Sequence, residues 1–277
     1  MTIPPLAAEP LFHIGSFPVT NAYVNSTIAV AGFLIAALVL KRRITLVPGT
    51  LQNAAESVIE FLLGFFDQVT ADREKSKRFL PLVATLFLFI LVSNWMGLLP
   101  GTGSIGRWLM HEGQVELIPI FRPAGSDLNL TLAMALVSVL ASHAFGVVTL
   151  GFFVHWNRFI QLGTVWKAVV SLKPIAILTA LVEFIVGLIE LFSEVAKVIS
   201  LSLRLFGNIF AGEVLITVIS GLVSFAVPLP FMALELIVGI VQATVFALLT
   251  LVYLTVATSA PHGDEEHAPS PKAAAAH

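Results

Sequence analysis

Cysteine is absent from the 277 residues, and charged residues make up only 12% of them. The first absence excludes disulfides, thiolate nucleophiles and cysteine metal ligands. The second excludes an ordinary soluble domain, which would carry about a quarter charged residues. With a net charge of −2 and no basic patch interleaved with aromatic residues, the sequence predicts no nucleic-acid partner. The histidines, among them His13, His111, His143 and His155, are not spaced as a metal site. No cofactor is expected.

Hydrophobic residues make up 57% of the chain, and the mean hydropathy is +0.94. The sequence therefore predicts an all-α integral membrane protein, with about five membrane-embedded helices and one amphipathic surface helix. A span needs about 18 or more apolar residues to cross a ~30 Å hydrocarbon core. The candidates are residues 26–40, extended back to Tyr23, and residues 79–99, 128–154, 174–227 and 231–257, with a turn at Pro228 and Pro230 between the last two. We expect an extramembrane segment 1–25, one membrane domain 26–257 and a disordered polar tail 258–277.

The surface helix is expected at about residues 50–70. Its apolar positions recur at three- and four-residue steps, which is the pattern of an amphipathic helix; they are Leu51, Ala55, Val58, Ile59, Leu62, Phe65, Phe66 and Val69. The polar face is acidic rather than basic. Contact with the membrane surface and contact with a partner protein explain the pattern equally well.

Basic residues are unevenly distributed between the predicted loops. Seven of the 15 Lys and Arg lie in residues 41–78, three lie in residues 155–173 and two lie in residues 101–127. Because cytoplasmic loops carry the excess of positive charge, residues 41–78 and 155–173 are expected in the cytoplasm. Five passes then place the N-terminus outside and the C-terminus in the cytoplasm.

The stretch 174–227 can be read as two spans or as one long helix. Two spans would need a hairpin near residues 193–202, where there is no glycine, proline or asparagine. One helix would be roughly 80 Å long, so it would have to tilt steeply or lie along the membrane. Six polar side chains fall within an arc of about 80° on its surface, which favours one helix; they are Glu183, Glu190, Glu194, Lys197, Arg204 and Asn208.

Arg204 is the least expected of these residues. An arginine at mid-membrane costs roughly 2.5–3.5 kcal/mol on insertion scales, which makes it a functional candidate. Glu194 is more than two turns away, and Glu213 lies on the opposite side of the helix. The counter-ion of Arg204 is therefore expected from another helix or another protein. By contrast, Glu190, Glu194 and Lys197 have the spacing of a local ion-paired face.

The last helix carries Glu235 and, seven residues on, Gln242 on the same face. If the long helix runs outward and the last one inward, Glu213 and Glu235 both lie on the outer side of Arg204. Two carboxylates there indicate a path for proton entry. Each can alternatively be a neutral hydrogen-bond donor with a purely structural role.

The segment SLSLRLFGNIFAGE, residues 200–213, resembles the signature of subunit a of the rotary ATP synthases, the stator half of a membrane proton channel. The matching residues are Ser200, Ser202, Leu203, Arg204, Leu205, Gly207, Asn208, Ala211, Gly212 and Glu213. VQATVFALLTLVYL, residues 241–254, is similar to the last helix of that family, with Gln242 at its characteristic glutamine. FLFILVSNWMGLLPG, residues 87–101, resembles its first deep hairpin helix.

The resemblance implies two steeply tilted helices around a ring of small hairpin subunits (subunit c), each with one membrane carboxylate. It gives Arg204 the role of attracting that carboxylate and separating two half-channels, with Asn208 and Gln242 beside it. Glu213 would belong to the outer half-channel and Glu190 to the inner one, with Lys197 near the latter. The other implied partners are the lipid membrane, subunit b of the peripheral stalk and the rest of the ATP synthase, in a bacterial plasma (inner) membrane.

Glu235 departs from the relatives that have a histidine opposite the outer glutamate. The entrance would then be a Glu213–Glu235 pair, and two close carboxylates are expected to share a proton. The implied function is non-catalytic coupling of proton translocation to ATP synthesis, since no GxxxxGK[ST] phosphate loop occurs in the chain. Proton is the default coupling ion over sodium.

Two other functions are open at this point. A free-standing secondary transporter would use Arg204 to bind an anionic substrate, and it predicts repeated halves and broken helices. A non-transporting scaffold would use the polar stripe only as a subunit interface.

Overall fold

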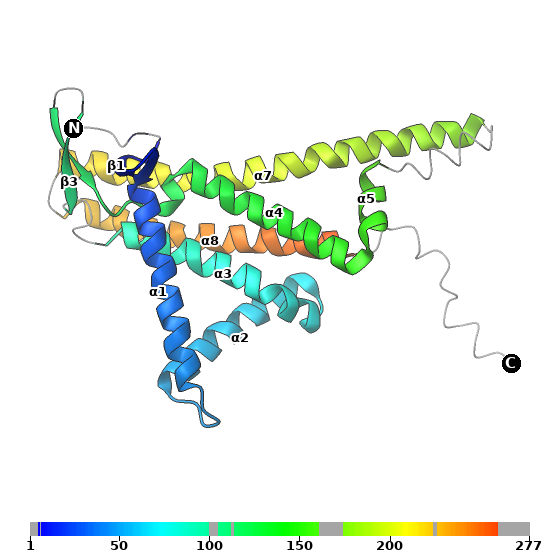
Figure 1. Cartoon of the computed structure of the whole chain (residues 1–277), viewed down its shortest axis with the longest axis horizontal. Helices are drawn as coiled ribbons and strands as arrows, with labels where there is room; N and C mark the ends of the chain where they lie inside the picture. The colour runs from blue at the N-terminus through cyan, green and yellow to red at the C-terminus, as the bar shows by residue number, and fades with distance from the viewer. Residues whose placement is uncertain are drawn as a thin grey trace. The chain divides into compact units, whose positions relative to one another are not determined.

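The computed structural model describes residues 5, 7–99, 105–111, 114–160, 174–223 and 226–259. Helices make up most of it, which confirms the all-α class (Figure 1). They are α1 Asn21–Arg43, α2 Thr50–Thr70, α3 Arg73–Gly97, the 3-10 turn η2 Ala124–Ser126, α4 Leu128–Leu150, α5 Phe152–Ile160, α7 Pro174–Leu222 and α8 Pro228–Thr258. The chain divides into two compact units, residues 1–138 with 197–252 and residues 139–196 with 253–277.

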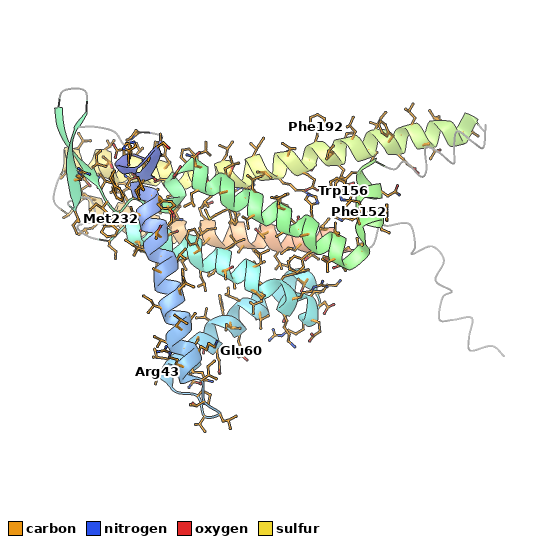
Figure 2. The ribbon with its side chains drawn as sticks, viewed as in Figure 1. Arg43, Glu60, Phe152, Trp156, Phe192 and Met232 are labelled. Carbon is orange, nitrogen blue, oxygen red and sulfur yellow. The ribbon has the colours of Figure 1, made fainter. Side chains whose placement is uncertain are left out.

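Four helices are long and apolar enough to cross a membrane: α1, α3, α4 and α8. Their outward surfaces are apolar; on α1, for example, the side chains of Leu34 and Ile35 are 60% and 63% exposed. Such surfaces suit contact with lipid tails. Figure 2 shows side chains projecting along α7 as well, among them the exposed Phe192.

The first spans begin earlier than the apolar runs predicted. The hydroxyl of Thr20 accepts a hydrogen bond from the Tyr23 N–H and caps α1, and the Asp72 carboxylate accepts from the Glu74 and Lys75 N–H groups and caps α3. Both are standard N-cap contacts, which satisfy donors that the first helical turn leaves free. The caps extend each helix into polar sequence that hydropathy alone assigns to loops.

The third span is shorter than predicted. The apolar run to residue 154 suggested one helix, but α4 ends at Leu150 and α5 begins at Phe152. Gly151 lies between them with φ +90, a backbone conformation that side chains other than hydrogen disfavour. One glycine thus redirects the chain inside a continuous apolar run.

Helix α7 is uninterrupted over 49 residues, as the single-helix interpretation predicts. It ends at Leu222, five residues before the predicted limit, and Ala226 has φ 66 in the turn that follows. The prediction that Pro228 and Pro230 make this turn is wrong, because α8 begins at Pro228. Proline fits the first helical turn, where its missing N–H would have had no partner.

Two antiparallel hairpins occur in segments that were predicted only as extramembrane or loop. β1 (Pro10–Ile14) pairs with β2 (Phe17–Thr20), and β3 (Gly106–His111) pairs with β4 (Gln114–Pro119). The first turns at Gly15, whose φ of 65 suits a tight turn. Strands of four to six residues give too weak a hydropathy pattern to be predicted beside long apolar helices.

The predicted surface helix is present as α2, and half of its apolar face packs within the subunit. Leu62, Leu63 and Phe66 are buried, whereas Leu51 and Val58, nearer its start, are exposed. The exposed half leaves contact with the membrane and contact with a partner protein both open. The predicted disordered tail falls largely in residues 260–277, outside the described residues.

Candidate functional site

A buried loop before α4 is held by asparagine side chains from two helices. The Asn25 amide of α1 donates to the Arg122 carbonyl at 2.7 Å and to the Ser93 carbonyl at 2.9 Å. On α3, the Asn94 Oδ1 accepts from the Gly125 N–H at 2.9 Å. A Cβ atom at Gly125 would lie 2.7 Å from that oxygen, so the loop approaches as closely as glycine allows. These bonds fix the backbone at one arginine and just after it.

That arginine, Arg122, is only 2% exposed. Its Nε lies 3.0 and 3.1 Å from the two carboxylate oxygens of Glu213, on α7, and 3.1 Å from the Ser126 hydroxyl. Its Nη1 donates to the Ala7 carbonyl at 3.1 Å and its Nη2 to the Pro5 carbonyl at 2.8 Å. A buried guanidinium is stable only when paired and hydrogen-bonded in this way. The network therefore fixes the position of the Glu213 carboxylate.

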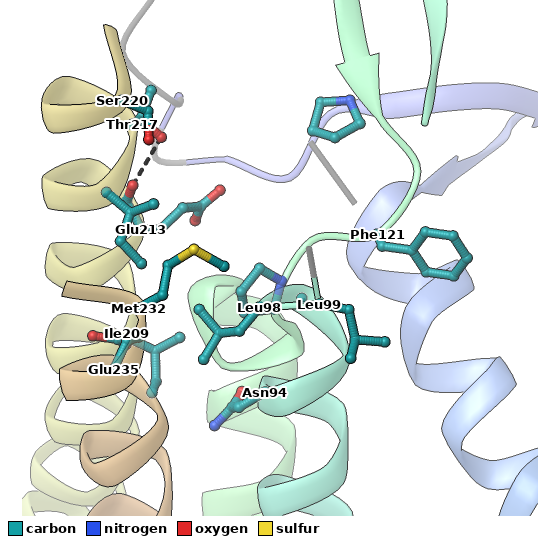
Figure 3. A pocket seen from close by; sticks show the side chains of 14 residues that line it. Asn94, Leu98, Leu99, Phe121, Ile209, Glu213, Thr217, Ser220, Met232 and Glu235 are labelled. Atoms are coloured by element: carbon teal, nitrogen blue, oxygen red, sulfur yellow. Dashed lines mark hydrogen bonds between the residues drawn. The ribbon is translucent and has the colours of Figure 1, made fainter. Parts of the chain in front are cut away.

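Glu213 opens onto a cavity of about 380 Å³ within the unit formed by residues 1–138 and 197–252. Figure 3 shows Glu213 from α7 and Glu235 from α8 among the residues that line it. Its polar lining also includes Asn94, Thr217 and Ser220. The remaining lining is mostly apolar, with Leu98, Leu99, Phe121, Ile209 and Met232. The cavity is large enough for several water molecules and has the polar groups to hold them.

Glu235 is 7% exposed and packs against the backbone of α7. A Cβ atom at Gly212 would overlap its carboxyl group, so the approach depends on the glycine. Its Oε1 has no hydrogen-bond partner among the described residues. A buried carboxyl oxygen of this kind needs a partner, and the cavity can supply one as water or a proton. The structure thus brings together the two predicted outer carboxylates.

Arg204 lies on a different surface of α7. Its side chain is exposed, and the Nη2 lies 3.5 Å from the Ser200 hydroxyl. Within the described residues it has no ion pair, and the origin of its counter-ion in another helix or another protein stays a prediction. Asn208, one turn on, is exposed as well, and a Cβ atom at Gly207 would meet nothing within 4 Å. The buried side of this part of α7 is formed by Leu201, Ser202, Leu205, Ile209 and Gly212.

The other predicted residues lie on α7 and α8 without joining the cavity. Gln242, Glu190 and Lys197 are all partly buried, and Glu190 belongs to the unit that contains residues 139–196. The roles predicted for these three residues stay predictions.

Arg122 and the asparagines that hold its loop were not predicted as site residues. In the sequence, Arg122 is one of two basic residues in a predicted loop. The signal was present in Asn21, Asn25 and Asn94, three amides within apolar helices, because polar residues there need specific partners. Which loop they hold could not be read from one sequence.

Comparison with known proteins gives a consistent family. A sequence profile described as ATP synthase A chain matches residues 23–255. The ATP synthase subunit a of Moorella thermoacetica is 31% identical over 244 residues, which are 88% of this chain and 93% of the relative. That of Geobacter sp. (strain M21) is 32% identical over 250 residues, or 90% and 89% of the two chains. That of Mycobacterium ulcerans is 33% identical over 241 residues, or 85% and 86%.

Proposed function

This chain belongs to the ATP synthase A chain family, whose members are the proton-channel stator subunits of F-type ATP synthases, and we propose that its channel is divided between two places. The first is the cavity at Glu213 and Glu235, which takes protons in from outside. The second is the exposed face at Arg204, which meets the carboxylates of the rotor. The observation that carries the proposal is this separation, on one helix, of a buried acidic cavity from an exposed arginine that has no ion pair among the described residues.

The cavity has the properties of an outer half-channel. Two carboxyl groups and the hydroxyls of Thr217 and Ser220 line one water-sized space, so a proton can pass between them by short steps. Arg122 holds Glu213 at the wall of the space, and the free Oε1 of Glu235 can take up the proton that Glu213 releases. Glu235 fills the place that a histidine has in some relatives.

The face at Arg204 has the properties of a contact with a ring of subunit c. Leu203, Gly207 and Ala211 are exposed around Arg204 and Asn208, which leaves a largely apolar surface with a cation in it. A ring carboxylate that arrives protonated is stabilised as an anion beside this cation, and so releases its proton. Because arginine stays charged, it cannot itself carry protons from one half-channel to the other.

Asn208 and Gln242 are proposed as polar neighbours of Arg204. Glu190 and Lys197, on the polar stripe of α7, are proposed for the inner half-channel. Each proton that crosses releases about 2.3 kcal/mol per 100 mV of membrane potential. The subunit contributes the path and leaves the chemistry of ATP to other subunits.

The distribution of basic residues supports one arrangement in the membrane. We propose five passes, made by the four apolar helices and α7, with the N-terminus outside and the C-terminus in the cytoplasm of a bacterial cell. Subunit c contacts α7 and α8, and subunit b of the peripheral stalk contacts the outside of the subunit. The cavity argues against a pure scaffold, because an interface alone has no need of two buried carboxyl groups around water-sized space.

The test is ATP-driven proton pumping by reconstituted ATP synthase. Arg204→Ala is expected to assemble, because it removes a costly membrane cation, and to stop pumping. Arg43→Ala, which removes an exposed arginine at the end of α1, is the matched control and should pump at the wild-type rate. Pumping by Arg204→Ala vesicles at the wild-type rate would show that the proposed function is wrong.

A further inference from the structure

The guanidinium of Arg122 is shared between Glu213 and the backbone of the N-terminal segment, which is Pro5 together with residues 7–9 before β1. Its Nε lies 3.0 and 3.1 Å from the two carboxylate oxygens of Glu213. Its Nη1 donates to the Ala7 carbonyl at 3.1 Å, and its Nη2 donates to the Pro5 carbonyl at 2.8 Å. One side chain therefore joins the wall of the acidic cavity to the N-terminal segment.

The pair of Arg122 and Glu213 is not the strongest that these two side chains can form. Arginine and a carboxylate frequently pair through two parallel N–H···O bonds. Here the hydrogen bond to Glu213 comes from Nε, which also lies 3.1 Å from the Ser126 hydroxyl. Because the guanidinium is planar and rigid, the two carbonyls that bind Nη1 and Nη2 fix its orientation. The fork is thereby kept from turning toward Glu213.

The N-terminal segment is itself anchored at two further points. The Asn21 N–H, at the start of α1, donates to the Glu9 carbonyl at 3.1 Å. Nη1 of Arg107, on β3, donates to the Leu11 carbonyl at 2.8 Å, and the Leu11 side chain is 6% exposed. These contacts hold the start of the chain against Arg122, which is 2% exposed.

We infer that the N-terminal segment, acting through Arg122, sets how readily Glu213 takes up a proton. By holding Nη1 and Nη2, its carbonyls leave Glu213 paired through the Nε–H, so the carboxylate can gain a proton from the cavity and lose it again. The inference rests on the proposed role of Glu213 in proton entry. Without the segment, Arg122 can turn and form the two-bond pair, which stabilises the charged carboxylate. Glu213 would then take up protons only from more acidic solution.

The charged groups that face Glu213 are Arg122, on the loop before α4, and Glu235, on α8. The N-terminal segment carries Glu9, and the same loop carries Asp127, whose carboxylate accepts from a backbone N–H at the start of α4. Removal of residues 1–8 leaves all of these side chains in place. A changed pH dependence of proton entry in such a chain would therefore report on the Arg122 guanidinium.

The experiment compares the complete chain with one that starts at a new methionine before Glu9, both assembled into ATP synthase in vesicles. Passive proton conduction through the head-stripped complex is measured while the pH on the cavity side is varied between about 4 and 8. All rates are divided by the amount of assembled complex. Arg107→Met loosens the same segment at its second anchor. Ala7→Ser is the matched control, because it changes an exposed side chain of the segment and keeps the carbonyl.

A second control separates the guanidinium from the charge of the new amino terminus. In Arg122→Lys, a single ammonium replaces the fork and cannot form the two-bond pair. Removal of residues 1–8 from Arg122→Lys should therefore cause no further change in the pH profile. A charge effect of the new terminus would persist in that background.

The shortened chain is expected to reach half-maximal conduction at a pH lower by about one unit, with its maximal rate kept. Arg107→Met should shift in the same direction, and Ala7→Ser should match wild type. An unshifted profile, an equal loss at every pH, or a shift that persists in Arg122→Lys would overturn the inference. If the shortened chain fails to assemble, Arg107→Met decides.

Glu213→Gln in the complete chain separates this inference from the proposed function. If Glu213→Gln conducts as wild type does, proton entry at Glu213 fails and the inference fails with it. If Glu213→Gln loses conduction while the shortened chain keeps the wild-type profile, only the role of the N-terminal segment is refuted.

Discussion

Arg122 and Glu213 form a buried ion pair across 91 residues of sequence, with the arginine Nε 3.0 Å from the nearer carboxylate oxygen. The pair joins the loop before α4 to the C-terminal part of α7. It has two consequences, since the same contact stabilises the fold and fixes the carboxylate that borders the cavity. Substitutions can separate these effects.

Arg122→Met should destabilise the subunit by about 3–5 kcal/mol, because it leaves Glu213 buried without its cation. Thermal unfolding of the purified complex, together with the amount of subunit in membranes, measures this. The double variant Arg122→Met/Glu213→Gln should recover part of the loss, since no unpaired charge remains. Equal stability of Arg122→Met and the exposed control Arg43→Met would contradict the importance of the pair.

Glu213→Gln should slow proton entry without opening a leak. Glutamine can keep a hydrogen bond to Arg122 but cannot take up and release a proton. The measurement is the initial rate of ATP-driven acidification in vesicles, expected to fall at least about tenfold, with Glu60→Gln on the exposed side of α2 as the control. A normal rate would place proton entry elsewhere.

Gly212→Ala tests the close approach of α7 and α8. The new methyl group would overlap the Glu235 carboxyl, so the variant should displace that side chain and reduce pumping. Gly32→Ala is the matched control, because a Cβ atom there meets nothing within 4 Å. It should leave pumping unchanged and stabilise α1 by roughly 0.5–1 kcal/mol. Similar pumping by the two variants would show that the position of Glu235 is not critical.

The turn between α2 and α3 should loosen in acid. The Ser76 hydroxyl and the Arg73 guanidinium, whose Nη1 lies 2.6 Å from Oδ2, hold the pKa of Asp67 below its usual range. Because the folded pKa is the lower one, this stabilisation is present above the usual aspartate range, near pH 4, and is lost as the pH falls through the folded value. Amide protection factors around Asp67 should therefore decrease in acid, and Asp67→Asn should abolish that decrease. If the protection factors of Asp67→Asn decrease in acid as they do in the wild type, the Asp67 carboxylate does not stabilise this turn.

Much of the architecture follows from sequence because lipid imposes simple rules. Long apolar runs predict α1, α3, α4 and α8, and the single arc of polar residues predicts that α7 is continuous. The errors lie where one residue outweighs the pattern: Gly151 ends α4 early, and Pro228 starts a helix instead of a turn. A hydropathy profile averages over such single-residue effects.

Part of the site was predictable because charge is rare in a membrane helix, which makes Arg204, Glu213 and Glu235 conspicuous. Arg122 is not conspicuous, since a loop arginine is ordinary until the fold buries it against Glu213.

The central claim is that Arg204 keeps the two half-channels apart while the ring turns past it. The most direct measurement is passive proton conduction through the membrane sector of Arg204→Ala, after the catalytic head has been stripped off. We predict that conduction persists or rises above wild type, although ATP-driven pumping and ATP synthesis are lost. Arg204→Lys should also lose both coupled activities, because a compact ammonium lacks the planar, always-charged guanidinium. An Arg204→Ala sector that is assembled but closed to protons would contradict the account.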